Sequence, residues 1–133
     1  MLMSVELVIK FLLAIILGGI IGIEREKAHK PAGIRTHMLV ALGACLFTVS
    51  SIVFGVDTGR IAAGIVAGIG FIGAGTIIGS KGNVKGITTA ASLWTTSSVG
   101  LMIGMGEYFA GVVATLLVLF ILVLDNLTKK WLK

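Results

Sequence analysis

The residues with the most recognisable chemical spacing are three glycines, Gly68, Gly70 and Gly73, which match the G-x-G-x-x-G pattern of dinucleotide-binding loops. Such a loop follows a strand, opens a helix, and is followed about 20 positions later by an acidic residue that binds the ribose. Here both flanks are apolar and of membrane length, and the segment ASLWTT at that distance contains no acid. We therefore predict that the chain binds no nucleotide and no other cofactor.

Hydroxyl side chains are concentrated in the segment GITTAASLWTTSSVG, which is polar for a chain this apolar. In a helix, five of them occupy or flank one face: Thr88, Thr89, Ser92, Thr95 and Thr96. They would either bond to carbonyls of their own helix and to a neighbouring helix, or line a polar cleft against the glycine-rich segment before them. Trp94 lies in the same run and is expected to pack in the core.

Charged side chains follow the first apolar segment in the sequence GIEREKAHKPAGIRTH. Glu24 and Arg25 stand where a charge must be paired or hydrated. Together with Arg35 they form either a buried network, which could act as a gate, or a solvated cluster against lipid head groups. His29 and His37 are eight residues apart, which does not place both on one helical turn, so a metal site there is not expected.

Acidic residues are missing from the second, third and fourth apolar segments. Magnesium takes oxygen ligands, often one or two carboxylates with retained waters. The sequence therefore shows no carboxylate-lined path for this ion, and the metal ligands stay unknown. The sequence also shows no nucleophile beside a base, so we do not expect an enzyme.

The composition indicates which elements must position these residues. The 133-residue chain is 56% hydrophobic and 13% charged, with a mean hydropathy of +1.08, whereas a soluble domain is about 25% charged. Because lipid-exposed backbone must satisfy its own hydrogen bonds, apolar runs of about 20 residues should be helices that cross a bilayer. We predict an all-α, polytopic transmembrane bundle in the cell membrane, with one domain over residues 1–133. Its five spans are residues 7–23, 36–54, 61–78, 87–105 and 108–124.

The basic residues predict how the bundle is oriented. Nine of the 11 occur in three segments: the first loop (Arg25, Lys27, Lys30, Arg35), the third loop (Lys81, Lys85) and the C-terminal tail (Lys129, Lys130, Lys133). Five spans place these segments on one face, and the positive-inside rule makes that face cytoplasmic. The N-terminus is then outside and the C-terminus inside. The net charge of +5 is thus explained by the membrane, and no nucleic acid is expected as a partner.

The glycines predict close packing between helices. Small residues four apart let helix backbones approach, and four such pairs occur: Gly18 with Gly22, Gly64 with Gly68, Gly75 with Gly79, and Gly100 with Gly104. So many faces in a short bundle suggest a homo-oligomer, most simply a dimer, or another membrane protein as partner, besides the lipid bilayer. A sharper alternative is that GIGFIGAGT breaks the third helix. Asp57 and Thr58 are the candidate caps for the start of that helix.

Three linked motifs, GIEREKAHKPAGIRTHMLVALGACLF, RIAAGIVAGIGFIGAGTII and VKGITTAASLWTTSSVGL, resemble the MgtC/SapB family of membrane proteins from Gly18 to about Leu124. The resemblance implies a role in survival at low magnesium, although family members are described both beside Mg²⁺ transporters and as regulators. Many relatives carry a soluble C-terminal domain, which this sequence is not expected to include. The resemblance and the hydroxyl face give the candidate site residues: Glu24, Arg25, Arg35, Thr36, Arg60, Gly70, Gly73, Gly75, Thr76, Thr88, Thr89, Ser92, Trp94 and Thr95.

Two functions follow from these observations. We expect a small inner-membrane protein linked to Mg²⁺ homeostasis or adaptation to low Mg²⁺, which acts by binding other membrane proteins through its glycine faces. The alternative is an ion or small-solute transporter or channel whose path runs between the third and fourth helices.

Overall fold

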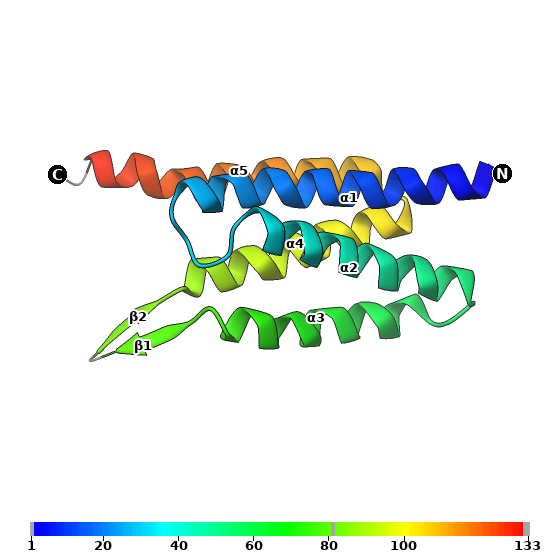
Figure 1. Cartoon of the computed structure of the whole chain (residues 1–133), viewed down its shortest axis with the longest axis horizontal. Helices are drawn as coiled ribbons and strands as arrows, with labels where there is room; N and C mark the ends of the chain where they lie inside the picture. The colour runs from blue at the N-terminus through cyan, green and yellow to red at the C-terminus, as the bar shows by residue number, and fades with distance from the viewer. Residues whose placement is uncertain (1, 81, 132–133) are drawn as a thin grey trace.

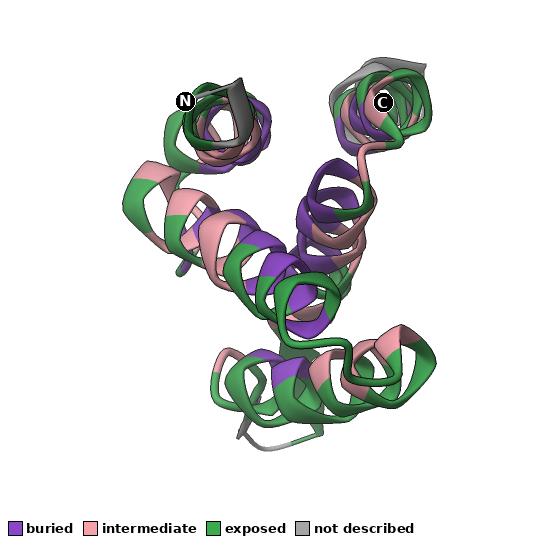
Figure 2. Ribbon diagram, turned by 90° about the vertical axis from the view of Figure 1, so that its right-hand side faces the viewer, coloured by how far each residue is buried: buried purple, intermediate pink, exposed green. Residues whose placement is uncertain are grey.

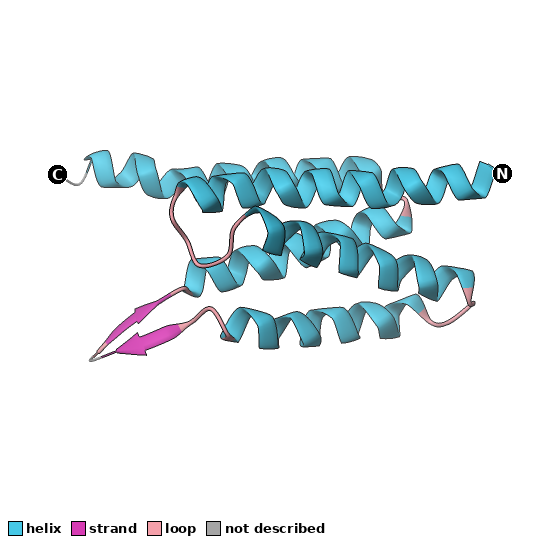
Figure 3. Ribbon diagram, viewed as in Figure 1, coloured by secondary structure: helices cyan, strands magenta, loops and turns pink. Residues whose placement is uncertain are grey.

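The computed structural model describes residues 2–80 and 82–131, and within them the chain forms five helices and a short hairpin (Figure 1, Figure 3). The order is α1 (Leu2–Lys27), α2 (Ile34–Val53), α3 (Thr58–Ala74), β1 (Ile78–Ser80), β2 (Asn83–Lys85), α4 (Ile87–Met105) and α5 (Tyr108–Trp131). The predicted helical architecture is confirmed, and the antiparallel hairpin is an addition that the sequence did not predict.

The helices lie in three layers, which Figure 2 shows along their axes. α1 and α5 form one outer layer, α2 and α4 the middle layer, and α3 the other outer layer. α4 contacts all four other helices, whereas α3 packs mainly against α2 and α4. The middle layer is therefore the part of the bundle that holds the rest together.

The hydrophobic core lies where α1, α2 and α4 meet. Its buried members are Ala14, Leu17, Ile21, Ala41, Cys45, Val49, Val99, Ile103 and Leu122. Cys45 is fully buried, as expected for a small core residue. By contrast, α3 buries only Ile69 and Gly73, and most of its length is exposed in Figure 2.

The outer surface of the bundle is apolar. Phe71 on α3 is 85% exposed and Phe109 on α5 is 84% exposed, and a protein in water rarely leaves large apolar patches uncovered. Among the described residues, α1 and α2 are long and apolar enough to cross a membrane, and α3 and the part of α5 up to Leu124 are apolar but shorter. Both features suit a lipid environment.

The third helix begins as expected and ends early. The Asp57 side chain accepts a hydrogen bond from the amide of Gly59 at 2.9 Å, which confirms the predicted cap. We predicted a helix over residues 61–78, but α3 stops at Ala74. The Gly75 amide still bonds four residues back, but the amides of Thr76 and Ile77 bond three residues back, and the Thr76 hydroxyl donates to the Gly73 carbonyl at 2.8 Å. These local bonds compete with the helix and end it.

The suggested break does fall within GIGFIGAGT, but near its end. α3 is continuous through Gly68 and Gly70 and stops at Ala74, so the helix ends there and is not interrupted midway. The chain then reverses between β1 and β2, where Gly82 has a φ of +80°, a conformation that glycine adopts without strain.

Close packing at glycines is confirmed for two of the four pairs. A Cβ added at Gly18 would lie 2.6 Å from the His37 carbonyl oxygen, and one at Gly22 2.6 Å from Ile34 Cα. A Cβ at Gly100 would collide with the Ala41 carbonyl, and one at Gly104 would lie 2.7 Å from Thr48 Cβ, so these two glycines also let backbones meet. Close packing thus joins α1 to α2 and α2 to α4.

The third-helix pairs do not pack in this way within one chain. A Cβ added at Gly64, Gly68 or Gly70 would meet nothing within 4 Å. Gly75 with Gly79 forms no helical pair, because α3 ends before Gly75. Within one chain the prediction fails for these pairs, because the glycine spacing shows that backbones could approach but not which helix lies opposite. Packing of these glycines against a second copy stays a prediction.

The connections alternate between the two ends of the bundle. Figure 1 shows the α1–α2 loop, the hairpin and the C-terminal end of α5 at one end, and the N-terminus and the two other links at the opposite end. The first of these ends, which we call the basic end, carries the first and third loops in which the sequence concentrates its lysines and arginines.

Candidate functional site

A largely buried ion pair lies in the last turn of α1, at the basic end. The Arg25 Nη2 donates to Glu24 Oε1 at 2.8 Å, and Arg25 Nε donates to the other carboxylate oxygen. Arg25 is only 2% exposed. Adjacent helix residues do not normally face each other, so the pair forms here because both charges are taken out of solvent and each needs a partner.

His37, one turn into α2, bridges two further segments of the bundle. The ring is fully buried, with Nδ1 2.9 Å from the Gly33 carbonyl oxygen and Nε2 3.0 Å from Ser92 Oγ on α4. We call Glu24, Arg25, His37 and Ser92 the polar cluster. Its bond between His37 and Ser92 joins α2 to α4, and its Glu24–Arg25 pair lies within the end of α1.

Counting protons shows that the polar cluster has two hydrogen-bond states. A carbonyl only accepts, so the Nδ1 of His37 carries a proton. If the ring is neutral, Nε2 accepts and the Ser92 hydroxyl must donate to it. The same hydroxyl lies 2.8 Å from the Thr89 carbonyl, and its single proton cannot serve both acceptors. Protonation of His37 at both nitrogens would release the hydroxyl to Thr89.

The hydroxyl face of α4 differs from the predicted one. Thr89, Ser92 and Thr96 are buried, while Thr88 is exposed and Thr95 is partly exposed, bonded only to carbonyls of its own helix. Of the five predicted residues, the buried face therefore contains Thr89, Ser92 and Thr96 and leaves out Thr88 and Thr95. The first alternative is confirmed for Ser92, Thr95 and Thr96, because their hydroxyls bond to carbonyls of α4 and Ser92 also bonds to α2. Ser92 points to α2 rather than to α3 because α2 is the helix that packs closely on α4 through the glycines.

One further expectation about a single side chain was wrong, because Trp94 is 48% exposed rather than packed in the core. The two alternatives for Glu24, Arg25 and Arg35 divide between the residues. Glu24 and Arg25 form a largely buried pair, whereas Arg35 is exposed and, among the described residues, bonds to neither, as in the solvated alternative.

The glycine candidates lie around the end of α3. Gly70 and Trp94 line an open apolar depression between α3 and α4, in which Gly73 lies against Ala90. Gly75 is the C-cap of α3. The hydroxyl of Thr76 lies 3.4 Å from the Gly86 carbonyl, across the strands of the hairpin.

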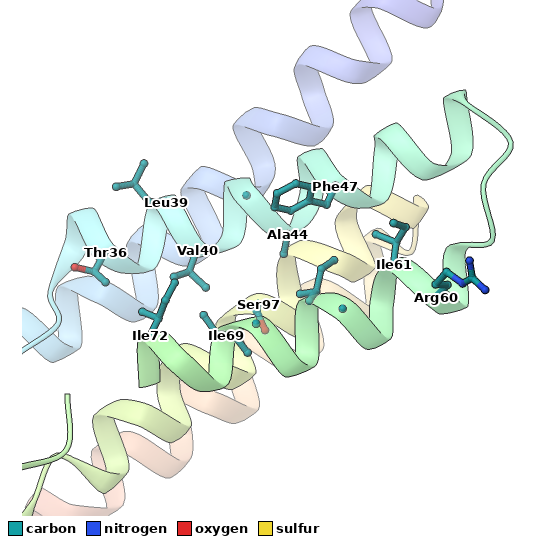
Figure 4. A pocket seen from close by; sticks show the side chains of 14 residues that line it. Thr36, Leu39, Val40, Ala44, Phe47, Arg60, Ile61, Ile69, Ile72 and Ser97 are labelled. Carbon is teal, nitrogen blue, oxygen red and sulfur yellow. The ribbon is translucent and has the colours of Figure 1, made fainter. Parts of the chain in front are cut away.

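The remaining candidates, Thr36 and Arg60, lie at opposite ends of a cleft between α2 and α3 (Figure 4). The cleft has a volume of about 580 Å³. Its walls are apolar apart from Thr36, Arg60 and the hydroxyl of Ser97, which donates to a carbonyl of its own helix at 2.7 Å. Thr36 is at the basic end and Arg60 at the other, so Arg60 stands apart from the other candidates.

Within the described residues, no group of three or more histidine, cysteine, aspartate or glutamate side chains is placed to hold a metal ion. The carboxylate of Glu24 is occupied by Arg25. The polar cluster thus joins α2 to α4 through a hydrogen bond whose direction depends on the protonation of His37, and the cleft presents an apolar surface between α2 and α3.

Sequence reasoning missed His37 and Ser97 as site residues. His37 stood in the motif GIRTH, but a histidine at the start of an apolar helix gives no sign of its partner, which is 55 residues away. Ser97 fell outside the expected hydroxyl face because that face was misplaced.

Comparison with known proteins gives a consistent answer. The model of the MgtC family matches residues 11–131. The chain is 41% identical over 130 residues to the Escherichia coli K12 protein named "Putative magnesium transporter YhiD", which is 90% of this chain and 60% of that protein. It is 44% identical over 113 residues to Protein MgtC of Salmonella typhimurium LT2, which is 84% of this chain and 49% of that protein.

The chain therefore spans about half to three fifths of the length of these curated relatives. No solved structure is significantly similar to it.

Proposed function

We propose, from the premise that the chain belongs to the MgtC family, that it is a small multi-pass membrane protein that contributes to magnesium homeostasis. The resemblance that the sequence motifs predicted is confirmed. The link to magnesium rests on the name of the Escherichia coli relative and on the family's association with low Mg²⁺. We infer that the chain acts by binding a membrane protein, either a second copy or another chain, and catalyses no reaction.

The observation that carries this proposal is the uncovered face of α3. Ala63, Ala67, Gly70 and Ala74 follow one another at helical spacing on that face, and all four are exposed. Small residues in a row let a second transmembrane helix approach closely, and van der Waals packing then drives association in lipid. The helix packs on its own bundle through Ile69 and Gly73, which leaves this face free for a partner.

We also propose that all five helices cross the membrane, with the N-terminus outside and the C-terminus inside, as one domain. The common position of the first loop and the hairpin at the basic end supports this arrangement. A reporter that is active only in the cytoplasm should then work when fused after Lys133 and fail when fused after Ser4. The reverse result would refute the orientation.

Transport is the second candidate, and the name of the Escherichia coli relative favours it. Its path would follow the depression between α3 and α4, which is lined by Gly70, Gly73 and Trp94. The described walls of that depression are apolar, so an ion would need the carboxylates of a partner or of a further part of the chain. Ion uptake into liposomes that contain the purified protein, with Mg²⁺ and a panel of other ions, separates the two candidates.

The test of the partner proposal is growth in low Mg²⁺ at matched amounts of protein in the membrane. Ala67→Leu adds bulk to the exposed face of α3, and we expect it to lose function while the protein still accumulates. Ala110→Leu is the matched control, because Ala110 is equally exposed on α5. If both variants support growth equally, the face of α3 is ordinary lipid-facing surface and the proposal is wrong.

A further inference from the structure

We propose that the cleft between α2 and α3 is a phospholipid site, in which an acyl chain lies between the helices and Arg60 binds the phosphate of the same molecule. The inference goes beyond the proposed function, because it concerns a different face of α3 and a different class of ligand. It rests on the shape of the cleft, on the glycines that keep it open, and on the charge at its mouth.

The shape of the cleft suits a hydrocarbon chain. It runs along α3 from Arg60 to Ile72, which is about 18 Å at 1.5 Å per residue. One leaflet of a bilayer has a hydrocarbon thickness of about 15 Å, half of the roughly 30 Å core. An acyl chain whose head group sits beside Arg60 would therefore reach to about Ile72.

The volume of the cleft, about 580 Å³, leaves room for an acyl chain. A hydrocarbon chain whose carbons approach their neighbours at about 3.5–4.0 Å fills about 300 Å³ over a length of about 18 Å. The cleft can therefore hold one chain along its length, and the experiment below separates a lipid from a helix of a second copy.

Three glycines keep the cleft open. Gly43 on α2 and Gly64 and Gly68 on α3 line it, and a Cβ added at any of them would meet nothing within 4 Å. Glycine within a helix costs about 0.5–1 kcal/mol relative to alanine, and no close contact inside this chain requires it at these positions. A ligand that fills the cleft would explain why glycines, rather than larger residues, line both α2 and α3 there.

The charge at the mouth explains which ligand binds. Arg60 is exposed at the end of the cleft, and none of the described residues forms an ion pair or hydrogen bond with its guanidinium (Figure 4). The nearby Asp57 carboxylate instead caps α3 by accepting the amide of Gly59. A guanidinium matches the geometry of a phosphate and can bind two of its oxygens. The structure therefore pairs an apolar slot with a phosphate-binding group, which is the pattern of a phospholipid.

The experiment is native mass spectrometry of the full chain, purified in detergent, stripped of lipid and titrated with phosphatidylglycerol. Gly68→Leu fills the cleft from α3, and we expect it to weaken binding at least tenfold. Arg60→Gln should weaken binding of phosphatidylglycerol about tenfold, the loss expected for one charge-assisted hydrogen bond, and leave the binding of diacylglycerol, which has no phosphate, unchanged. Val66→Phe adds bulk to α3 outside the cleft and is the control.

Two results would overturn the proposal. One is that Gly68→Leu binds phosphatidylglycerol as well as the unchanged protein does. The other is that Gly68→Leu converts a dimer into a monomer without changing lipid binding, which would assign the cleft to a second copy of the chain. The spectra report lipid binding and oligomeric state directly and do not depend on growth. The lipid proposal can therefore fail while the proposed function holds, and the reverse is also possible.

Discussion

Two glycines that look alike in the sequence should respond oppositely to the same substitution. Gly18 and Gly70 both lie in apolar, glycine-rich helices. A Cβ at Gly18 would lie 2.6 Å from the His37 carbonyl oxygen, whereas ordinary contact begins at 3.4 Å, so α1 must withdraw from α2 by about 0.8 Å in Gly18→Ala. A Cβ at Gly70 would meet nothing within 4 Å, so Gly70→Ala requires no movement.

The magnitudes follow from these distances. Overpacking in a well-packed site costs about 1–3 kcal/mol, and alanine recovers up to about 1 kcal/mol as the better helix former. The clashing atom is a backbone carbonyl that cannot rotate away, so the upper part of the overpacking range, about 2–3 kcal/mol, applies at Gly18. Less the recovery of about 1 kcal/mol, Gly18→Ala should lower the free energy of unfolding by about 1–2 kcal/mol. Gly70→Ala should leave it unchanged or raise it by up to about 1 kcal/mol.

The measurement is the unfolding of each purified variant in mixed micelles with increasing sodium dodecyl sulfate, followed by the loss of helical circular dichroism. The unchanged protein at the same detergent concentration is the reference. Two results would contradict the reasoning: Gly18→Ala as stable as the reference, or a free energy of unfolding for Gly70→Ala that falls by more than about 1 kcal/mol. Either result would mean that Gly18 is not tightly packed or that Gly70 is not in open space.

The polar cluster and the orientation of α4 give the remaining predictions. Arg25→Gln leaves the Glu24 carboxylate unpaired at a nearly buried position and should cost about 3 kcal/mol in the same unfolding measurement, while Arg35→Gln, at an exposed position, should change stability by less than about 0.5 kcal/mol. Ser92→Ala removes the partner of the His37 ring and should cost about 1–2 kcal/mol, whereas Thr95→Ala should cost less than about 0.5 kcal/mol because its hydroxyl bonds only within α4. Equal effects within either pair would contradict the placement of the cluster.

Much of the architecture could be read from the order of residues alone. Apolar runs of membrane length can satisfy their backbone only as helices, and this requirement is local to each run. The number of helices and the Asp57 cap at the start of α3 were therefore predictable. The pairing of Glu24 with Arg25 was also within reach, because both residues lie together at the end of one helix.

The tertiary structure alone decided which surfaces meet. The bond between His37 and Ser92 joins residues far apart in the chain, and it exists because Gly100 and Gly104 bring α4 against α2. The same four-residue spacing of Gly64 and Gly68 leads to no contact at all. A spacing between small residues determines how closely a helix can be approached, but the presence of a neighbour depends on how the whole bundle packs.

The end of α3 also depends partly on the sequence and partly on the tertiary structure. Glycines weaken a helix wherever they occur, and the run from Gly64 to Gly79 contains several candidate ends. α3 ends after Ala74, where Thr76 bonds to the Gly73 carbonyl and reaches toward Gly86 across the hairpin. The residue types determined that the helix could end at several points. It ends where the local bonds of Thr76 replace the helical ones and where the same hydroxyl can also reach Gly86, a contact that only the tertiary structure supplies.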